Sequence, residues 1–140
     1  MLYCANVGDA RIVLSRGGKA ERLTYDHKAT DEGESQRIRD MGTWVIQGKV
    51  GGTLAVTRAF GDIEMKEFVH AEPYQTTTQL SSSDKILIIA CDGLWDVCED
   101  QMAVDLASKE ANPQKASELL LKYALENGST DNISIIVIHL

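Results

Sequence analysis

The apolar run from Ile86 to Cys91 limits the fold more than any other stretch of this sequence. It is too short for a typical helix and has the usual length of a β-strand. Because no polar residue alternates with the apolar ones, we expect this strand to be buried on both faces. A second apolar strand is expected from Ile133 to Leu140, at the end of the chain.

Further short strands are expected upstream, separated by turns at Gly8-Asp9 and Gly17-Gly18. The expected strands run from Leu2 to Val7, Arg11 to Ser15, Lys19 to Leu23 and Gln75 to Leu80, with a strand pair around Gly51-Gly52 between Trp44 and Val56. Residues 57–73 are predicted to be irregular, with at most a short helical turn.

Three helices are predicted from capping residues and apolar spacing. The first begins at Thr30 and ends near Met41, the second follows Glu99 and Asp100, and the third has Asn112 as its cap. The residues expected on the buried faces of the last two are Met102, Ala103, Leu106, Ala107, Ala116, Leu119, Leu120, Tyr123 and Ala124. Grouped strands followed by grouped helices predict an α+β fold, with helices covering one face of an antiparallel sheet. No linker divides residues 1–140, so we expect a single unit.

Composition excludes some classes of function. The net charge of -7 argues against a nucleic-acid partner, because phosphate backbones need a basic surface. No apolar run is long enough for a membrane helix, and the start of the chain does not resemble a signal peptide. Three cysteines in apolar surroundings favour free thiols in a reducing compartment. We therefore expect a cytoplasmic and/or nuclear protein without a membrane partner.

Aspartates at strand ends are the main chemical feature. Asp92 follows the buried strand, Asp131 precedes the last strand, and Asp9 follows the first. If the two apolar strands are antiparallel neighbours, Asp92 and Asp131 converge at one rim of the sheet. A helical turn after Asp92 would bring Asp96 to the same side.

Clustered carboxylates repel one another unless a cation lies between them. Oxygen ligands select hard ions such as Mg²⁺ or Mn²⁺, and two such ions can activate a water for an in-line displacement at phosphorus. The alternative is that each aspartate only satisfies a turn, because Asp-Gly and Gly-Asp are ordinary turn pairs. Spacing alone leaves both interpretations open.

The stretch from Ala90 to Asp96 resembles the signature of the type 2C (PPM) protein phosphatases. Four other segments resemble that family in the expected order: Ala5 to Arg11, Thr24 to Lys28, Leu54 to Asp62 and Gly128 to Ser134. The resemblance runs over nearly the whole chain. It implies an antiparallel β-sandwich flanked by helices, and a metal-dependent protein serine/threonine phosphatase that hydrolyses phosphoserine and phosphothreonine by a metal-activated water.

The resemblance also implies roles for single residues. Asp92 and Asp131 would be ligands of a binuclear Mg²⁺ or Mn²⁺ site, and Asn132 would orient a water beside them. Asp9 and Asp96, together with Asp92, would hold a weaker third ion. Arg58 lies in a flap segment and would influence substrate access; the alternative for Arg58 is a solvated loop arginine.

Two other residues, His27 and Trp95, each have a functional and a structural interpretation. His27 could act as a general acid, but the segment it matches is a structural turn before a helix, and we favour that interpretation. Trp95 is expected to be a core anchor behind the metal site and not a substrate contact.

The Asp-Gly-His-Gly motif of the family is absent from the sequence, together with an upstream acidic ligand and a phosphate-binding arginine. We therefore expect the C-terminal portion of a catalytic domain that lacks its N-terminal part and is impaired or inactive alone. Exposed sheet edges would favour a dimer or a partner chain. The alternative functions are an inactive phosphatase-like binding or regulatory module and, less supported, simple cation binding.

Overall fold

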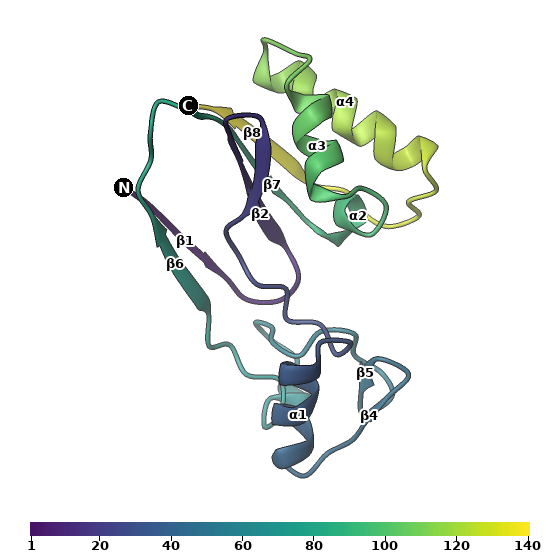
Figure 1. Ribbon diagram of the computed structural model, residues 1–140. Helices are drawn as coiled ribbons and strands as arrows, with labels where there is room; N and C mark the ends of the chain where they lie inside the picture. The colour runs from purple at the N-terminus through teal and green to yellow at the C-terminus, as the bar shows by residue number, and fades with distance from the viewer. The chain divides into compact units, whose positions relative to one another are not determined.

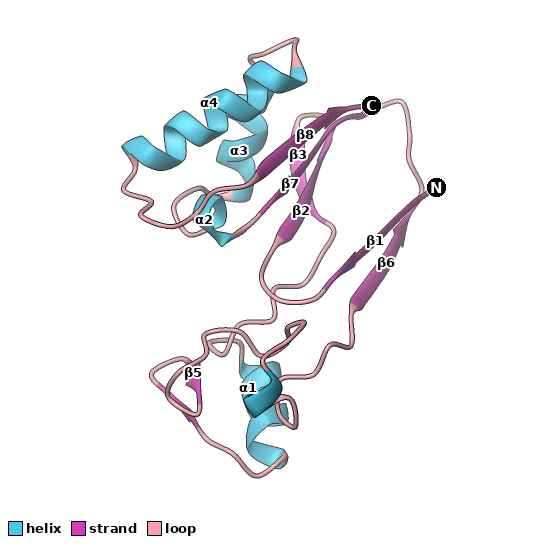
Figure 2. Ribbon diagram, turned by 180° about the vertical axis from the view of Figure 1, so that it is seen from behind, coloured by secondary structure: helices cyan, strands magenta, loops and turns pink.

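The computed structural model describes residues 1–140, which form two compact units. The first unit contains Met1–Cys4, Ala10–Thr24 and Gln75–Leu140, and the second contains Ala5–Asp9 and Tyr25–Tyr74. The units interleave along the sequence, so neither is one continuous stretch, as tandem domains would be. Figures 1 and 2 show the elements of each unit. No helix has both the length and the apolar character that crossing a bilayer requires.

The first unit is built on a four-stranded antiparallel sheet in the order β3-β2-β7-β8. Its strands are β2 (Arg11–Arg16), β3 (Lys19–Arg22), β7 (Asp84–Ala90) and β8 (Ile135–His139). Ile88 of β7 is paired with Val13 on one side and with Val137 on the other. Because Ile88 and Leu87 enter the cores on opposite faces, the prediction of a strand buried on both faces is confirmed.

Two helices cover one face of this sheet, as Figure 2 shows: α3 (Asp100–Ala107) and α4 (Pro113–Glu126). The side chain of Asn112 accepts a hydrogen bond from the Lys115 amide, so the predicted cap of α4 is confirmed. The prediction that Met102 is buried is wrong, because Met102 is exposed and Val104 is fully buried instead. Val104 lies in the core cluster with Val13 and Ile88, and Asp100 at the start of the helix pairs with Arg11 and Arg22.

The opposite face of the sheet carries a smaller apolar core. Leu14 and Leu87 of the sheet, together with Leu23, pack there against Cys4. Cys4 lies in β1 (Leu2–Asn6), which pairs with β6 (Tyr74–Thr78) in a separate two-stranded sheet. Helices on one face and a second strand layer on the other confirm the α+β prediction with antiparallel pairing.

The second unit contains α1 (Glu32–Asp40), a hairpin of β4 (Val45–Ile46) and β5 (Lys49–Val50), and the short 3-10 helix η1 (Ile63–Met65). Its core contains Ala29, Ile38, Val50 and Val69.

Two local predictions for this unit are wrong. The cap of α1 is Asp31 and not Thr30, since the Asp31 carboxylate accepts from the Glu34 amide. The hairpin turns at Gln47 and Gly48 and not at Gly51-Gly52, because both residues of that two-residue loop have the positive φ that a tight hairpin requires.

Candidate metal centre

The pairing of β7 with β8 brings the Asp92 and Asp131 segments to the same end of the sheet. The last residue of β7, Ala90, pairs with the first residue of β8, Ile135. Beyond this pair, the Cys91 amide donates a hydrogen bond to the Ser134 carbonyl at 3.2 Å. Asp92 follows β7 and Asp131 precedes β8, so the antiparallel arrangement expected from the sequence is the one observed.

A close backbone contact locks these two segments together. A Cβ atom added at Gly93 would clash with the carbonyl oxygen of Asn132, so only glycine fits there without a shift. The hydroxyl of Ser129 donates to the Gly93 carbonyl at 2.6 Å, and the Cys91 sulfur lies 3.2 Å from the backbone carbonyl oxygen of Asn132. Sequence reasoning missed these three contacts, since nothing in the local pattern marks a contact across about forty residues.

The short helix α2 (Asp92–Trp95) places Asp96 one turn beyond Asp92. The Asp96 amide donates to the Asp92 carbonyl at 2.8 Å, which confirms the predicted helical turn. Asp92 is half-buried, whereas Asp96 and Asp131 are exposed.

Trp95 lies in the main core behind this turn. Its indole nitrogen donates to the Ala90 carbonyl at 2.8 Å, and the Arg11 guanidinium lies 5.0 Å from its ring centroid. The expected role as a core anchor is therefore confirmed. Trp95 fixes α2 against the end of β7, and with it the position from which Asp92 projects.

The Arg11 side chain also joins the sheet to α3. It donates to Asp100 at 2.6 Å, and Arg22 donates to the other oxygen of the same carboxylate at 2.8 Å. Burial favours a raised pKa for Asp100, but the hydrogen bonds and charges of Arg22 and Arg11 outweigh it, so the pKa is lowered. This ion pair fixes the start of α3.

The donor atoms at this rim are of the type that a hard cation requires. Asp92, Asp96 and Asp131 supply carboxylate oxygens, and Asn132 supplies an amide oxygen. The Asp131 carboxylate accepts a hydrogen bond from the backbone amide of Asn132 at 2.7 Å, and this bond limits rotation of the carboxylate. No three His, Cys, Asp or Glu side chains come close enough together to hold a metal ion within this chain.

Asp9 and Arg58 belong to the second unit. The Asp9 carboxylate lies 3.7 Å from the Lys28 ammonium, in the turn after β1. Arg58 forms a bidentate pair with Glu34, with distances of 2.7 and 3.0 Å, and also donates to the Glu72 carbonyl. Arg58 is therefore an ion-paired, largely buried arginine and not a solvated loop residue.

Glu34 is the centre of a buried polar cluster that sequence reasoning missed. Besides Arg58, it accepts hydrogen bonds from Thr57 at 2.6 Å and from Arg37 at 3.1 Å. Burial acts to raise the pKa of Glu34, but the hydrogen bonds from Arg58, Thr57 and Arg37 together lower it to about 2. The only sequence signal was a glutamate three residues before an arginine on a predicted helix.

His27 is fully buried in the same unit. Its Nδ1 atom lies 3.2 Å from the Gly8 amide and 3.0 Å from the Gly8 carbonyl, and its Nε2 atom has no hydrogen-bond partner. Burial, with the nearby Arg58 charge, lowers the pKa of His27 below its ordinary value. A buried imidazole that ties two loops together supports the structural interpretation of His27.

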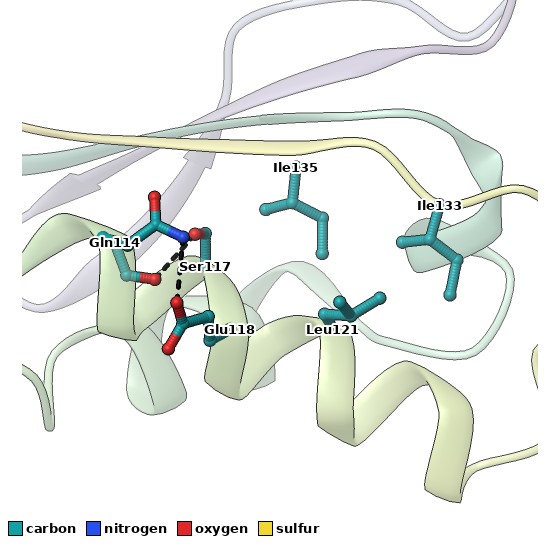
Figure 3. A pocket seen from close by; sticks show the side chains of 6 residues that line it. All are labelled: Gln114, Ser117, Glu118, Leu121, Ile133 and Ile135. Atoms are coloured by element: carbon teal, nitrogen blue, oxygen red, sulfur yellow. Dashed lines mark hydrogen bonds between the residues drawn. The ribbon is translucent and has the colours of Figure 1, made fainter.

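A pocket of about 210 Å³ lies between α4 and the segment that leads into β8, as Figure 3 shows. Its lining residues are Gln114, Ser117, Glu118, Leu121, Ile133 and Ile135. The Gln114 amide donates to the Glu118 carboxylate at 2.9 Å, so the one ionisable group of the pocket is already bonded. This pocket holds no set of groups for metal or phosphate chemistry.

Comparison with known proteins finds relatives over nearly the whole chain. Residues 1–133 match the family model described as protein phosphatase 2C. The chain is 50% identical over 139 residues to protein phosphatase 2C homolog 1 of Saccharomyces cerevisiae, covering 99% of this chain and 50% of that protein. It is 51% identical over 141 residues to protein phosphatase 2C homolog 1 of Schizosaccharomyces pombe, covering 100% of this chain and 41% of that protein.

A solved structure described as a C. elegans sex determining protein matches with a TM-score of 0.88 at 29% identity. The match covers 98% of this chain and 36% of that one. The chain thus spans about half, or less, of the length of the relatives it matches.

Proposed function

Because the chain belongs to the protein phosphatase 2C family, we propose that it forms the C-terminal part of a protein serine/threonine phosphatase domain that depends on Mg²⁺ or Mn²⁺. The observation that carries this proposal is the contact between the Asp92-Gly93 segment and the Ser129–Asn132 segment. This contact holds the segments that carry Asp92, Asp131 and Asn132, which are far apart in sequence, at one end of the sheet. A metal-dependent hydrolase would need their oxygen atoms at such a place.

The proposed roles follow from donor chemistry. Asp92 and Asp131 would hold the principal ions, and Asp96 with Asp9 would contribute to a weaker one. When bound, such ions lower the pKa of a coordinated water and neutralise charge on a phosphoryl group. The chain contributes the rigid positioning, because Trp95 and the Gly93 contact fix the backbone on both sides of Asp92. Asn132 offers an amide that can orient water at the same rim.

The substrate in this proposal is a phosphoserine or phosphothreonine protein, and Arg58 would affect its access. The isolated chain should be impaired, because Asp92, Asp96 and Asp131 supply fewer oxygens than a tight pair of ions needs. A dimer or a partner chain would then complete the centre.

A non-catalytic binding or regulatory module is the second candidate. It is favoured by apolar side chains that remain exposed on β8, an edge strand of the sheet. Ile136 and Ile138 are the residues concerned, and such surfaces commonly bind another chain.

The test is Mn²⁺-dependent hydrolysis of a phosphothreonine peptide, combined with Mn²⁺ titration. Asp92→Asn provides the inactive background, and Asp105→Asn, an exposed aspartate on α3, is the matched control. Hydrolysis lost in Asp92→Asn and kept in Asp105→Asn would support the phosphatase and show that this chain acts without the absent motif. If Mn²⁺ binds wild type and Asp92→Asn equally and neither hydrolyses the peptide, the binding module is the better account.

A further inference from the structure

One loop of the second unit exposes the two most solvent-accessible large apolar side chains of the protein. Phe60 is 80% exposed and Ile63 is 88% exposed. They are three residues apart in the sequence, and Ile63 borders a cavity of about 440 Å³. The cavity is lined by Thr53, Leu54, Asp62, Ile63, Glu64 and Met65. Exposed apolar side chains beside a cavity are typical of a surface that binds a partner.

The loop is held in this shape by its own contacts. Gly61 and Asp62 both have positive φ, 83° and 46°, and the non-glycine residue there carries a backbone strain of about 1 kcal/mol. The Lys66 ammonium donates to the Ala59 carbonyl at 2.7 Å and closes the loop. The Met65 side chain packs against the core of the unit and reaches within 3.0 Å of where a Gly51 Cβ would lie. Phe60 and Ile63 therefore project from a loop that is fixed at both ends.

The charges around the cavity indicate what it can bind. Asp62 and Glu64 are among its lining residues, and no lysine or arginine is. The nearest lysine in the sequence, Lys66, is occupied by the Ala59 carbonyl. A ligand with both cationic and apolar groups would match this lining. A second copy of this chain, with its net charge of -7, would match it poorly.

We propose that Phe60, Ile63 and the adjoining acidic cavity dock a substrate segment in which basic residues flank an apolar one. The apolar side chain would enter beside Leu54 and Met65, and the basic side chains would pair with Asp62 and Glu64. This inference rests on the proposed phosphatase function only in naming the bound protein as its substrate. The docking contact itself requires no metal.

Fluorescence anisotropy with unphosphorylated peptides tests the docking separately from hydrolysis. The probes are three labelled peptides that differ at one tripeptide, Lys-Leu-Arg, Lys-Ser-Arg or Glu-Leu-Glu. The variants are Ile63→Ser and Glu64→Gln, and the matched controls are Leu125→Ser and Glu126→Gln, both at exposed positions on α4. We expect the Lys-Leu-Arg peptide to bind best, and each variant to weaken it about fivefold or more while the controls do not.

Each outcome has a definite meaning. Equal binding of the three peptides, or equal weakening by variants and controls, would overturn the docking proposal. If the peptides do not bind and Ile63→Ser converts a dimer to a monomer in sedimentation, the occupant is a second copy and the proposal is also overturned. Selective binding by the wild-type chain, together with no Mn²⁺-dependent hydrolysis of the phosphothreonine peptide above the Asp92→Asn background, would keep the docking site and show that this chain is not an active phosphatase by itself.

Discussion

Replacing Glu34 with glutamine should destabilise the second compact unit strongly, although the side chain keeps its size. The carboxylate is buried and accepts hydrogen bonds from Arg58, Thr57 and Arg37. Glutamine removes the negative charge and replaces one acceptor oxygen with a donor that faces a guanidinium. Two arginines would then lie near a buried position without their counterion.

The magnitude follows from the pKa of Glu34, which is about 2 compared with an ordinary value of 4.5. Each pKa unit corresponds to about 1.4 kcal/mol, so the charged form contributes about 3 kcal/mol at neutral pH. Breaking a buried pair by removing one partner costs about 3–5 kcal/mol, which agrees. Because the folded pKa is depressed, this contribution is present above pH 4.5 and is lost as the pH falls toward 2.

Urea denaturation at pH 7 and pH 3, with amide exchange of α1 as the local probe, measures this effect. Glu32→Gln is the matched control, because the Glu32 side chain is 88% exposed and pairs only with Arg39 at the surface. The loss of unfolding free energy in Glu34→Gln should be about 3 kcal/mol at pH 7 and clearly smaller at pH 3. A loss below about 1 kcal/mol at pH 7, or an equal loss at both pH values, would refute the reasoning.

Three further predictions concern other parts of the molecule. Gly93→Ala should weaken Mn²⁺ binding and lower stability by about 2 kcal/mol, because the new methyl group would push the Asp92 segment away from the Asn132 carbonyl. Mn²⁺ titration measures the affinity and urea denaturation measures the stability. An unchanged Mn²⁺ affinity would contradict this prediction. The pKa of buried His27 is lowered from 6.5, so its contribution to stability is complete above pH 6.5 and declines as the pH falls below that value. His27→Gln should flatten the dependence of the urea midpoint between pH 7.5 and 5.5, and a wild-type slope retained in the variant would reject this. Asn112→Ala should cost about 1 kcal/mol by removing the cap of α4, measured by the same denaturation, whereas no change would show that Pro113 alone sets the start of this helix.

The part of the fold that could be predicted from sequence is the part in which local pattern and burial agree. The apolar runs ending at Cys91 and beginning at Ile133 identified the strand that precedes Asp92 and the strand that follows Asp131, and their antiparallel pairing places these two segments at the same end of the sheet. The run that ends at Cys91 is covered on both faces, as expected for an uninterrupted apolar strand, whereas Ile136 and Ile138 of the last strand remain exposed.

The remaining features depend on contacts between distant residues. Asp100 at the start of α3 binds Arg11 and Arg22, which are far upstream, and the apolar spacing around Met102 carries no signal of these contacts. The hairpin turn was misplaced because residues 47–52 offer several glycines, and only the pairing of Val45 with Val50 decides between them. The roles proposed for the site residues remain predictions, and these residues are Asp9, Arg58, Asp92, Asp96, Asp131 and Asn132.

Arg58 shows why a single substitution cannot separate stability from substrate access. Arg58→Met alone would leave Glu34 buried without its bidentate partner, so lost activity would not identify a substrate contact. A double-mutant cycle with Glu34→Met separates the two effects. If the pair acts only on stability, the loss of unfolding free energy in the double variant should be smaller than the sum of the losses in the two single variants, by about 2 kcal/mol or more. Its peptide binding should then equal that of Glu34→Met. Weaker peptide binding in the double variant than in Glu34→Met, at equal stability, would instead assign Arg58 a direct part in substrate access.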